Sequence, residues 1–549
     1  MLSARNVLAP TGRRGLLRSL VAGSAVAVSV VLPGAVAAAD EPDGTTVVGR
    51  LVQAWPEVAA GSAEPGAVEG PISWVEPAAG DAVRVPTEDV EGIPSGATVE
   101  VTVDGHHAGE DDPLHEVLDT GVVTLPAAPV PTPTAGLTNQ VTVALVTPDG
   151  VGRDAVTEQQ LIDVVDGPVA DFWSEETDGA IRLGVTTAHD WVTPDAGCSD
   201  PTAMWNEVAA TVGFVPGPGK HLLLYVSSRA TGCAYALGEV GAAPGSGGRM
   251  YVRNTGTSVI AHEFGHNFGL GHSSGRQCDA AVESDACRTV GYRDYYDVMG
   301  VSWAQLGSLN APQAARLSLL PAARQQSLTV SGSPVTVTLA PISGRTGTRA
   351  LRLTDAEGSD YWLEYRPASG RDAWLGTAAN RYGLDAGVLL RHGEGLPDTS
   401  VLLDATPAPA GDWNADHQAA LPLGTAVPVS GGDFTVVVQG LGPAGAVVSI
   451  TPAASVSPAA AVPVGRSPSG APGGVMSGTG HEAAPEAASS PQFWAPEHRG
   501  TRAFRDTGDL APAGDSSTVG GFVVALTASA LAGSALLVVR VLRRTARNR

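Results

Sequence analysis

The chain has 549 residues, with 56 acidic and 33 basic side chains and a formal net charge of −23. This length exceeds one ordinary domain, and the negative charge argues against a nucleic-acid-binding protein and favours a well-solvated secreted surface. The 68 glycines and 41 prolines favour loop-rich β structure and flexible linkers over long helical bundles.

Residues 1–39 have the pattern of a secretory signal peptide. Arginines come first, an apolar run follows over residues 20–32, and small residues extend to Ala39. The neighbouring Arg13 and Arg14 also resemble a twin-arginine signal, so the export route stays open between the two pathways. Either route places the mature protein outside the cytoplasm.

Residues 40–135 are predicted to form a small β-rich domain, which is either a propeptide or an accessory domain. Its short runs alternate between apolar and polar residues, as in 97–103. The segment contains no cysteine, so it cannot supply an inhibitory thiolate to a metal. We expect His106, His107 and His115 to be solvated loop residues.

Residues 136–325 alternate between strand and helix patterns, which predicts an α/β domain. The strongest predicted elements are strands at 140–146, 181–185 and 221–226, and helices at 155–173, 201–212, 257–269 and 311–319. The short strand at 249–253 has two interpretations of comparable weight. It is either the sheet edge beside a metal site, where a peptide could pair, or an internal strand.

Three histidines and one glutamate have spacings that indicate a shared metal ion. His262 and His266 are four residues apart and lie on one helix face, with Glu263 beside them. Gly269 can adopt the positive φ that ends a helix, so that His272 returns as a third ligand. Three nitrogens leave one position open, as in a catalytic zinc site, and Glu263 is then the candidate general base.

The extended pattern HExxHxxGxxH, with Met299 following in a turn-like segment, resembles the metzincin zinc proteases. Asn267 and the sequence Tyr-x-Asp-x-x-Asp-Val-Met-Gly at 292–300 look like the gametolysin-like peptidases and their bacterial relatives. This resemblance implies a zinc endopeptidase with Glu263 as the base and Met299 beneath the metal. The ligands that it implies are His262, His266 and His272.

Two positions depart from the patterns of related families. Val301 stands where some metzincins have a tyrosine ligand, so no tyrosine helper is transferred from them. Ser273 follows the third histidine where reprolysin-like members have aspartate, which leaves the support of that turn unassigned. We expect Tyr295 and Tyr296 to be packing residues.

The four cysteines lie in the middle third of the chain, downstream of the export signal, and two disulfides are expected. Three connectivities are possible. We favour Cys198 with Cys233 and Cys278 with Cys287, because the second pair closes a short loop directly after the metal motif.

The C-terminal part has four predicted regions. Residues 326–452 have the spacing of a β-sandwich, and 453–518 form an Ala/Pro/Gly/Ser-rich stalk. Residues 519–539 are uncharged and long enough to span a membrane, and the arginines of 540–549 hold the C-terminus in the cytoplasm. Residues 510–514 resemble a sortase signal, so attachment to the cell wall is a second possibility.

The whole sequence predicts an α+β protein: a metzincin-type catalytic domain between two β domains, with a C-terminal membrane anchor. We expect a surface-tethered zinc endopeptidase that acts on extracellular proteins or peptides, without a nucleic-acid partner. The alternative is a surface protein that binds glycans or proteins and carries a vestigial zinc site. The sequence indicates neither the natural substrate nor the oligomeric state.

Overall fold

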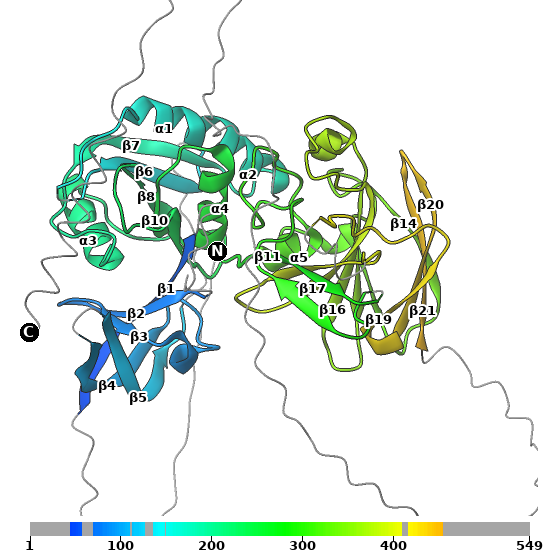
Figure 1. Ribbon diagram of the computed structural model, residues 1–549, viewed down its shortest axis with the longest axis horizontal. Coiled ribbons are helices and arrows are strands. Elements are labelled where there is room, and N and C mark those ends of the chain that lie inside the picture. Colours follow the sequence, from blue (N-terminus) through cyan, green and yellow to red (C-terminus); the bar gives the residue numbers. More distant parts are fainter. Residues whose placement is uncertain are drawn as a thin grey trace, which may run out of the picture. The chain divides into compact units, whose positions relative to one another are not determined.

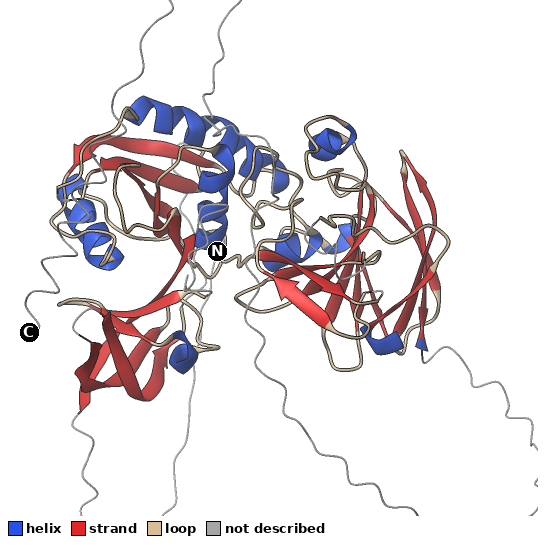
Figure 2. Ribbon diagram, in the orientation of Figure 1, coloured by secondary structure: helices blue, strands red, loops and turns tan. Residues whose placement is uncertain are grey.

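The computed structural model combines many strands with a few short helices, which confirms the α+β class (Figures 1 and 2). The predicted signal peptide, stalk, membrane span and basic tail lie outside the described residues. Within the described part of the chain, no helix is long and apolar enough to cross a membrane. The described residues are 44–57, 70–109, 112–126, 136–148, 150–280, 282–408 and 415–453.

One ten-stranded sheet runs through the first half of the chain, in the order β2-β3-β5-β4-β1-β9-β10-β8-β6-β7. The long strand β1 pairs with β2 and β4, and its last four residues pair with β9. The sheet therefore crosses the composition boundary near residue 135. Its strands are β1 (Gly44–Glu57), β2 (Ile72–Pro77), β3 (Val83–Val85), β4 (Thr98–Gly109), β5 (Asp112–Thr124), β6 (Asn139–Val146), β7 (Leu183–Val192), β8 (Lys220–Val226), β9 (Ala236–Glu239) and β10 (Gly248–Val252).

Helices pack on both faces of the strands β6, β8 and β10. Successive side chains of a strand point to opposite faces, so Val143 of β6 enters the core beneath α4, while Ala144 enters the core beneath α3. Such strands are apolar throughout because both of their faces are buried. The helices are α1 (Glu158–Val164), α2 (Ala170–Glu176), α3 (Pro201–Val212), α4 (Thr257–Asn267) and α5 (Ala311–Arg316).

The structure decides between the two interpretations of the strand at 249–253 and corrects one helix prediction. Strand β10 lies between β8 and β9, so the internal interpretation is confirmed and the sheet-edge interpretation is wrong. The helix predicted over 155–173 is two helices, joined by a π-helical turn at Val165–Val169. Gly167 has non-helical angles there, and the ring of Pro168 cannot continue a regular helix.

Two further sheets pack face to face in the C-terminal half (Figure 1). Leu363 and Leu390 of the larger sheet and Val436 and Val448 of the smaller one belong to a single core, as in a β-sandwich. The larger sheet contains β12 (Cys287–Val290), β11 (Ser273–Cys278), β18 (Ser400–Leu403), β17 (Gly387–Gly393), β16 (Asp360–Arg366), β15 (Ala350–Thr354) and β13 (Gln325–Thr329). The smaller sheet contains β14 (Val335–Leu339), β21 (Gly445–Pro452), β20 (Phe434–Gly442) and β19 (Ala426–Val429).

The two disulfides have the favoured connectivity. Cys198 is joined to Cys233, and Cys278 is joined to Cys287. The second bond links directly opposite residues of β11 and β12. Because β11 begins at the residue after His272, this hairpin connects the metal motif to the larger C-terminal sheet.

Candidate metal centre

Helix α4 and the turn after it position the three motif histidines. The helix begins at Thr257, after Gly256, which caps it without a side-chain hydrogen bond. The regular helix ends at Asn267, and Gly269 has φ of +97°, as the turn requires. The chain then enters β11 and brings His272 back toward His262 and His266.

The imidazole Nε2 atoms converge because the opposite nitrogens are held by carbonyl groups. His262 Nδ1 lies 2.8 Å from the Val298 carbonyl oxygen, and His266 Nδ1 lies 2.9 Å from that of Leu270. A carbonyl only accepts, so each Nδ1 carries the proton and each Nε2 presents a lone pair. The two Nε2 atoms are 3.1 Å apart.

Glu57 completes the cluster, and nothing in the sequence pattern indicates it. Its Oε1 lies 3.3 Å from Nε2 of His262 and 3.2 Å from Nε2 of both His266 and His272. The residue ends strand β1, 209 residues before His266, and reaches the histidines through the pairing of β1 with β9. These four buried residues form the candidate metal group.

The four ligand atoms fit a zinc ion. Tetrahedral bonds of about 2.0 Å separate ligand atoms by about 3.3 Å, which agrees with the 3.1 Å between His262 and His266 and the 3.2 to 3.3 Å from Glu57 to each histidine. All four ligand atoms lie within 4.8 Å of one another. In addition, with Nδ1 protonated, the Nε2 lone pairs of His262 and His266 converge on a carboxylate oxygen of Glu57. A buried set of acceptors that faces inward in this way requires a cation.

Glu263 lies beside this group, and its carboxylate makes no hydrogen bond with any other described residue. Both of its carboxylate oxygens are fully buried. Burial, and then the charge of Glu57, raise the pKa of Glu263 well above its usual range. The side chain fits because residue 238 is glycine: a Cβ at Gly238 would lie 2.6 Å from Glu263 Oε2.

Met299 lies directly beneath α4. A Cβ built on Gly265 would lie 2.2 Å from the Met299 sulfur, so the helix surface and the methionine are already in contact. The Met299 backbone is fixed by Asp297, whose Oδ1 accepts from the Met299 N–H at 2.9 Å. Ser273 donates to the same Oδ1 at 2.9 Å, so Asp297 supports the residue after His272.

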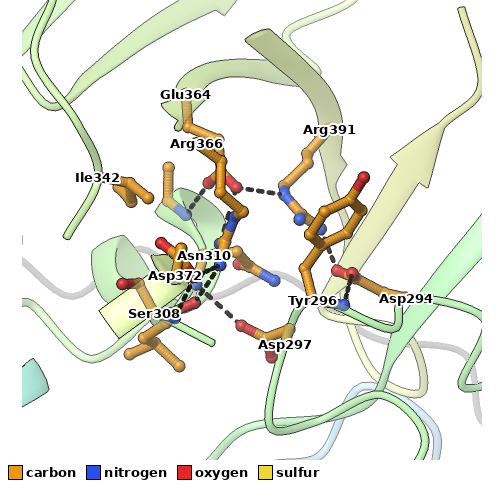
Figure 3. Close-up of polar contacts among 12 residues, drawn as sticks. Asp294, Tyr296, Asp297, Ser308, Asn310, Ile342, Glu364, Arg366, Asp372 and Arg391 are labelled. Atoms are coloured by element: carbon orange, nitrogen blue, oxygen red, sulfur yellow. Dashed lines mark hydrogen bonds and ion pairs between the residues drawn. The ribbon is translucent and has the colours of Figure 1, made fainter. Parts of the chain in front are cut away.

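Asp297 and Asp294 belong to a buried polar network that connects the methionine turn to the sandwich (Figure 3). Arg391 on β17 pairs with Asp294, and its Nε also donates to Glu364 on β16 at 3.1 Å. Arg366 pairs with the same glutamate at 3.0 Å. These four side chains are fully buried, so the β-sandwich holds the turn through charged hydrogen bonds.

Asn267, one of the residues that carry the family resemblance, connects α4 to the sheet beneath it. Its Oδ1 lies 2.9 Å from Nδ1 of His221 on β8, and its Nδ2 donates to the Glu239 carbonyl on β9 at 2.8 Å. Asn267 therefore has a structural role and fixes the distance between helix α4 and the strands.

Of the three tyrosines near the methionine, the one that sequence analysis left without a role is nearest to the metal group. The Tyr292 ring lies 3.9 Å from the His272 ring between centroids, and Tyr292 has φ of +60°. Burial, and then Glu57, which it hydrogen-bonds, raise the pKa of Tyr292 well above its usual range. Tyr295 and Tyr296 instead pack in a separate cluster with Trp374 and Leu389.

Residues 220–273 match the family model described as Metallo-peptidase family M12B Reprolysin-like. The match contains all three histidines and Glu263. Together with the buried histidine and glutamate cluster, it supports a metallopeptidase.

No curated protein matches the chain. Among solved structures, one described as "Structure of a chaperone-substrate complex" aligns at 12% identity over 42% of this chain. The alignment covers 33% of that chain, so only about a third of its length is spanned. Its TM-score of 0.20 is too low to indicate a shared fold.

Proposed function

We propose that this protein is a zinc metalloendopeptidase in which Glu263 is the general base. The observation that carries the proposal is the buried Glu263 carboxylate, which has no hydrogen-bond partner among the described residues and lies next to a histidine group built for a metal. A buried carboxylate without a partner destabilises the fold. Its presence at this position is explained by proton transfer during a reaction.

The site residues have two roles, metal binding and proton transfer. His262, His266 and His272 hold the zinc ion, which when bound supplies Lewis acidity that polarises a scissile carbonyl and acidifies a water molecule. Glu263 takes the proton of the attacking water and passes it to the leaving amine. The raised pKa of Glu263 makes its carboxylate a stronger base for the proton of the water.

The finer assignment is a metzincin-type, gametolysin-like enzyme that is exported and tethered to the cell surface. It is supported by the motif residues, by Met299 beneath α4, and by the export and membrane signals in the sequence. We place the catalytic part outside the cytoplasm, with extracellular proteins or peptides as substrates.

A test is hydrolysis of casein and of gelatin by the purified full chain, with and without a zinc chelator. Because Glu57 fills one position of the metal group, the assay also uses Glu57→Gln. We expect chelation, or Glu263→Ala in either background, to abolish hydrolysis. In the Glu57→Gln background, equal hydrolysis in chelated, unchelated and Glu263→Ala samples contradicts the proposal.

The second candidate is a surface-binding protein with a structural zinc site. One observation favours it: Glu57 makes the group four-coordinate, and structural zinc sites are closed by four protein ligands. Tight binding to a glycan or protein by a zinc-loaded chain that hydrolyses nothing, even as Glu57→Gln, would establish this role instead.

A further inference from the structure

The last four residues of strand β1 pair with β9 beside the metal group and cover the side of β9 that faces away from β10. Residues 54–57 pair antiparallel with β9, with Ala54 opposite Glu239 and Glu57 opposite Ala236. The pairing continues at both ends, where Val240 N–H donates to the Gln53 carbonyl at 2.7 Å and Tyr235 N–H donates to that of Glu57 at 2.8 Å. An extended peptide that binds by strand addition would need these same β9 groups.

The side chains of residues 54–57 also occupy the metal site, in addition to the backbone pairing with β9. Glu57 Oε1 is equidistant from the three imidazole Nε2 atoms within 0.1 Å. Trp55 is buried, and its ring lies 4.3 Å from that of His272 and 6.2 Å from that of His266, between centroids. Backbone pairing, an aromatic contact and a carboxylate at the fourth position together imitate a bound peptide.

We propose that the segment Ala54–Glu57 is an internal inhibitor, with Glu57 as the ligand that closes the metal site and keeps the peptidase latent. This inference rests on the proposed function, which needs an open fourth position for water. Because the segment belongs to the same chain, its effective concentration is on the order of millimolar or higher, and it outcompetes dilute substrates.

Buried ion pairs hold the inhibitory strand in place. Arg249 on β10 pairs with Glu239 on β9 at 2.5 Å and with Glu76 on β2 at 2.9 Å. Because β2 pairs with β1, this arginine joins the N-terminal strands to the catalytic strands. Activation therefore requires release of β1 from β9, for which cleavage within the N-terminal strands by a peptidase is the simplest chemistry.

The test measures access to the metal directly. The full chain is loaded with Co²⁺ in place of zinc, and acetohydroxamate, a bidentate metal ligand, is titrated while the visible absorption is recorded. If Glu57 leaves the metal in only a small fraction of molecules, the apparent affinity of the chain for acetohydroxamate is the intrinsic affinity multiplied by that fraction. We expect acetohydroxamate to bind Glu57→Gln at least about tenfold more tightly than the unsubstituted chain.

The matched control is Glu100→Gln, which alters an exposed carboxylate on β4 of the same sheet. We expect it to bind acetohydroxamate like the unsubstituted chain. Equal affinity in Glu57→Gln, Glu100→Gln and the unsubstituted chain overturns the proposal. If Glu57→Gln fails to fold, Glu57→Asp keeps the charge but withdraws the carboxylate by one methylene, and unchanged affinity in that variant also overturns it.

Peptide hydrolysis by the zinc-loaded variants separates this inference from the proposed function. A rise of at least about tenfold in Glu57→Gln but not in Glu100→Gln supports both. Tighter acetohydroxamate binding without hydrolysis leaves Glu57 as the closing ligand and refutes the peptidase. Hydrolysis by the unsubstituted chain at the rate of Glu57→Gln refutes latency and leaves the peptidase.

Discussion

Gly265 and Met299 are in contact with no space between them, since a Cβ on Gly265 would lie 2.2 Å from the Met299 sulfur. Gly265 lies on the helix turn that carries His262 and His266, and Met299 comes from the segment after the disulfide hairpin. The absence of one methyl group therefore sets the distance between the metal-binding helix and the turn beneath it.

Gly265→Ala should destabilise the protein by about 1–3 kcal/mol, because the added methyl forces the helix and the methionine apart in a packed core. Denaturant unfolding of the zinc-loaded chain measures this change. The control is Gly291→Ala, since a Cβ at the exposed Gly291 meets no atom within 4 Å. Equal destabilisation in the two variants would show that Met299 does not form a rigid packing contact with α4.

His221 should make the stability of the fold depend on pH. Burial lowers the pKa of His221 to about 4, while its usual value is 6.5. Between these values the unfolded chain binds a proton that the folded chain does not, so stability falls as the pH drops below 6.5. The limiting slope is about 1.4 kcal/mol per pH unit.

The measurement compares the free energy of unfolding at pH 7 and pH 5 in the unsubstituted chain and in His221→Gln. Glutamine does not titrate and retains hydrogen-bonding groups toward Asn267 and Asn139, the two partners of the imidazole. We expect the unsubstituted chain to lose about 2 kcal/mol more than the variant over this range. The same loss in both would mean that His221 does not titrate with unfolding.

The part of the site that the sequence predicts is local. His262, Glu263 and His266 lie on one helix, and Gly269 ends it, so spacing and backbone preference suffice to place three of the four motif groups. His272 needs only the turn that follows. The secondary structure of the strands and helices around them is similarly predictable from periodicity, as for α3 over Pro201–Val212.

What the sequence does not predict depends on contacts between distant segments. Glu57 is 215 residues from His272, and its place is set by the register of β1 on β9. The internal position of β10 has the same cause, because a short apolar strand has the same pattern with one neighbour or with two. The support of Ser273 by Asp297 also comes from a loop closed by packing, and no spacing rule indicates it.

Arg391 should be essential for the stability of the methionine turn. It pairs with Asp294 and Glu364, and all three side chains are fully buried. Arg391→Met leaves two buried carboxylates with fewer partners. Because breaking a buried ion pair is strongly destabilising, we expect the free energy of unfolding to fall by about 3–5 kcal/mol.

Denaturant unfolding of Arg391→Met gives this cost, and Arg352→Met is the matched control. Arg352 pairs with Asp360 on the same larger sheet, but its side chain is 42% exposed. Such a pair contributes about 0–1 kcal/mol. If the two variants unfold at the same denaturant concentration, the buried network does not hold the turn.

Ser273 and Ser274 offer a test of how the third histidine is supported. Both are fully buried neighbours on β11, but Ser273 donates to Asp297 at 2.9 Å whereas Ser274 donates to Asp398 at 2.6 Å. Only Asp297 also fixes the backbone of Met299. Groups that orient metal ligands in this way typically change metal affinity by about 10–100-fold when removed.

We therefore expect Ser273→Ala to weaken zinc binding by about tenfold or more, and Ser274→Ala to leave it nearly unchanged. Competition with a chromophoric chelator measures the zinc affinity, and denaturant unfolding shows whether both variants lose a similar hydrogen-bond energy of about 1 kcal/mol. Ser273 Oγ also accepts from Asn310 Nδ2 at 3.1 Å and from Gln313 Nε2 at 3.2 Å, so a difference in zinc affinity reports the support that this whole hydroxyl-centred network, Asp297 included, gives to His272. Equal zinc affinities would mean that the backbone turn at Gly269 suffices to place His272.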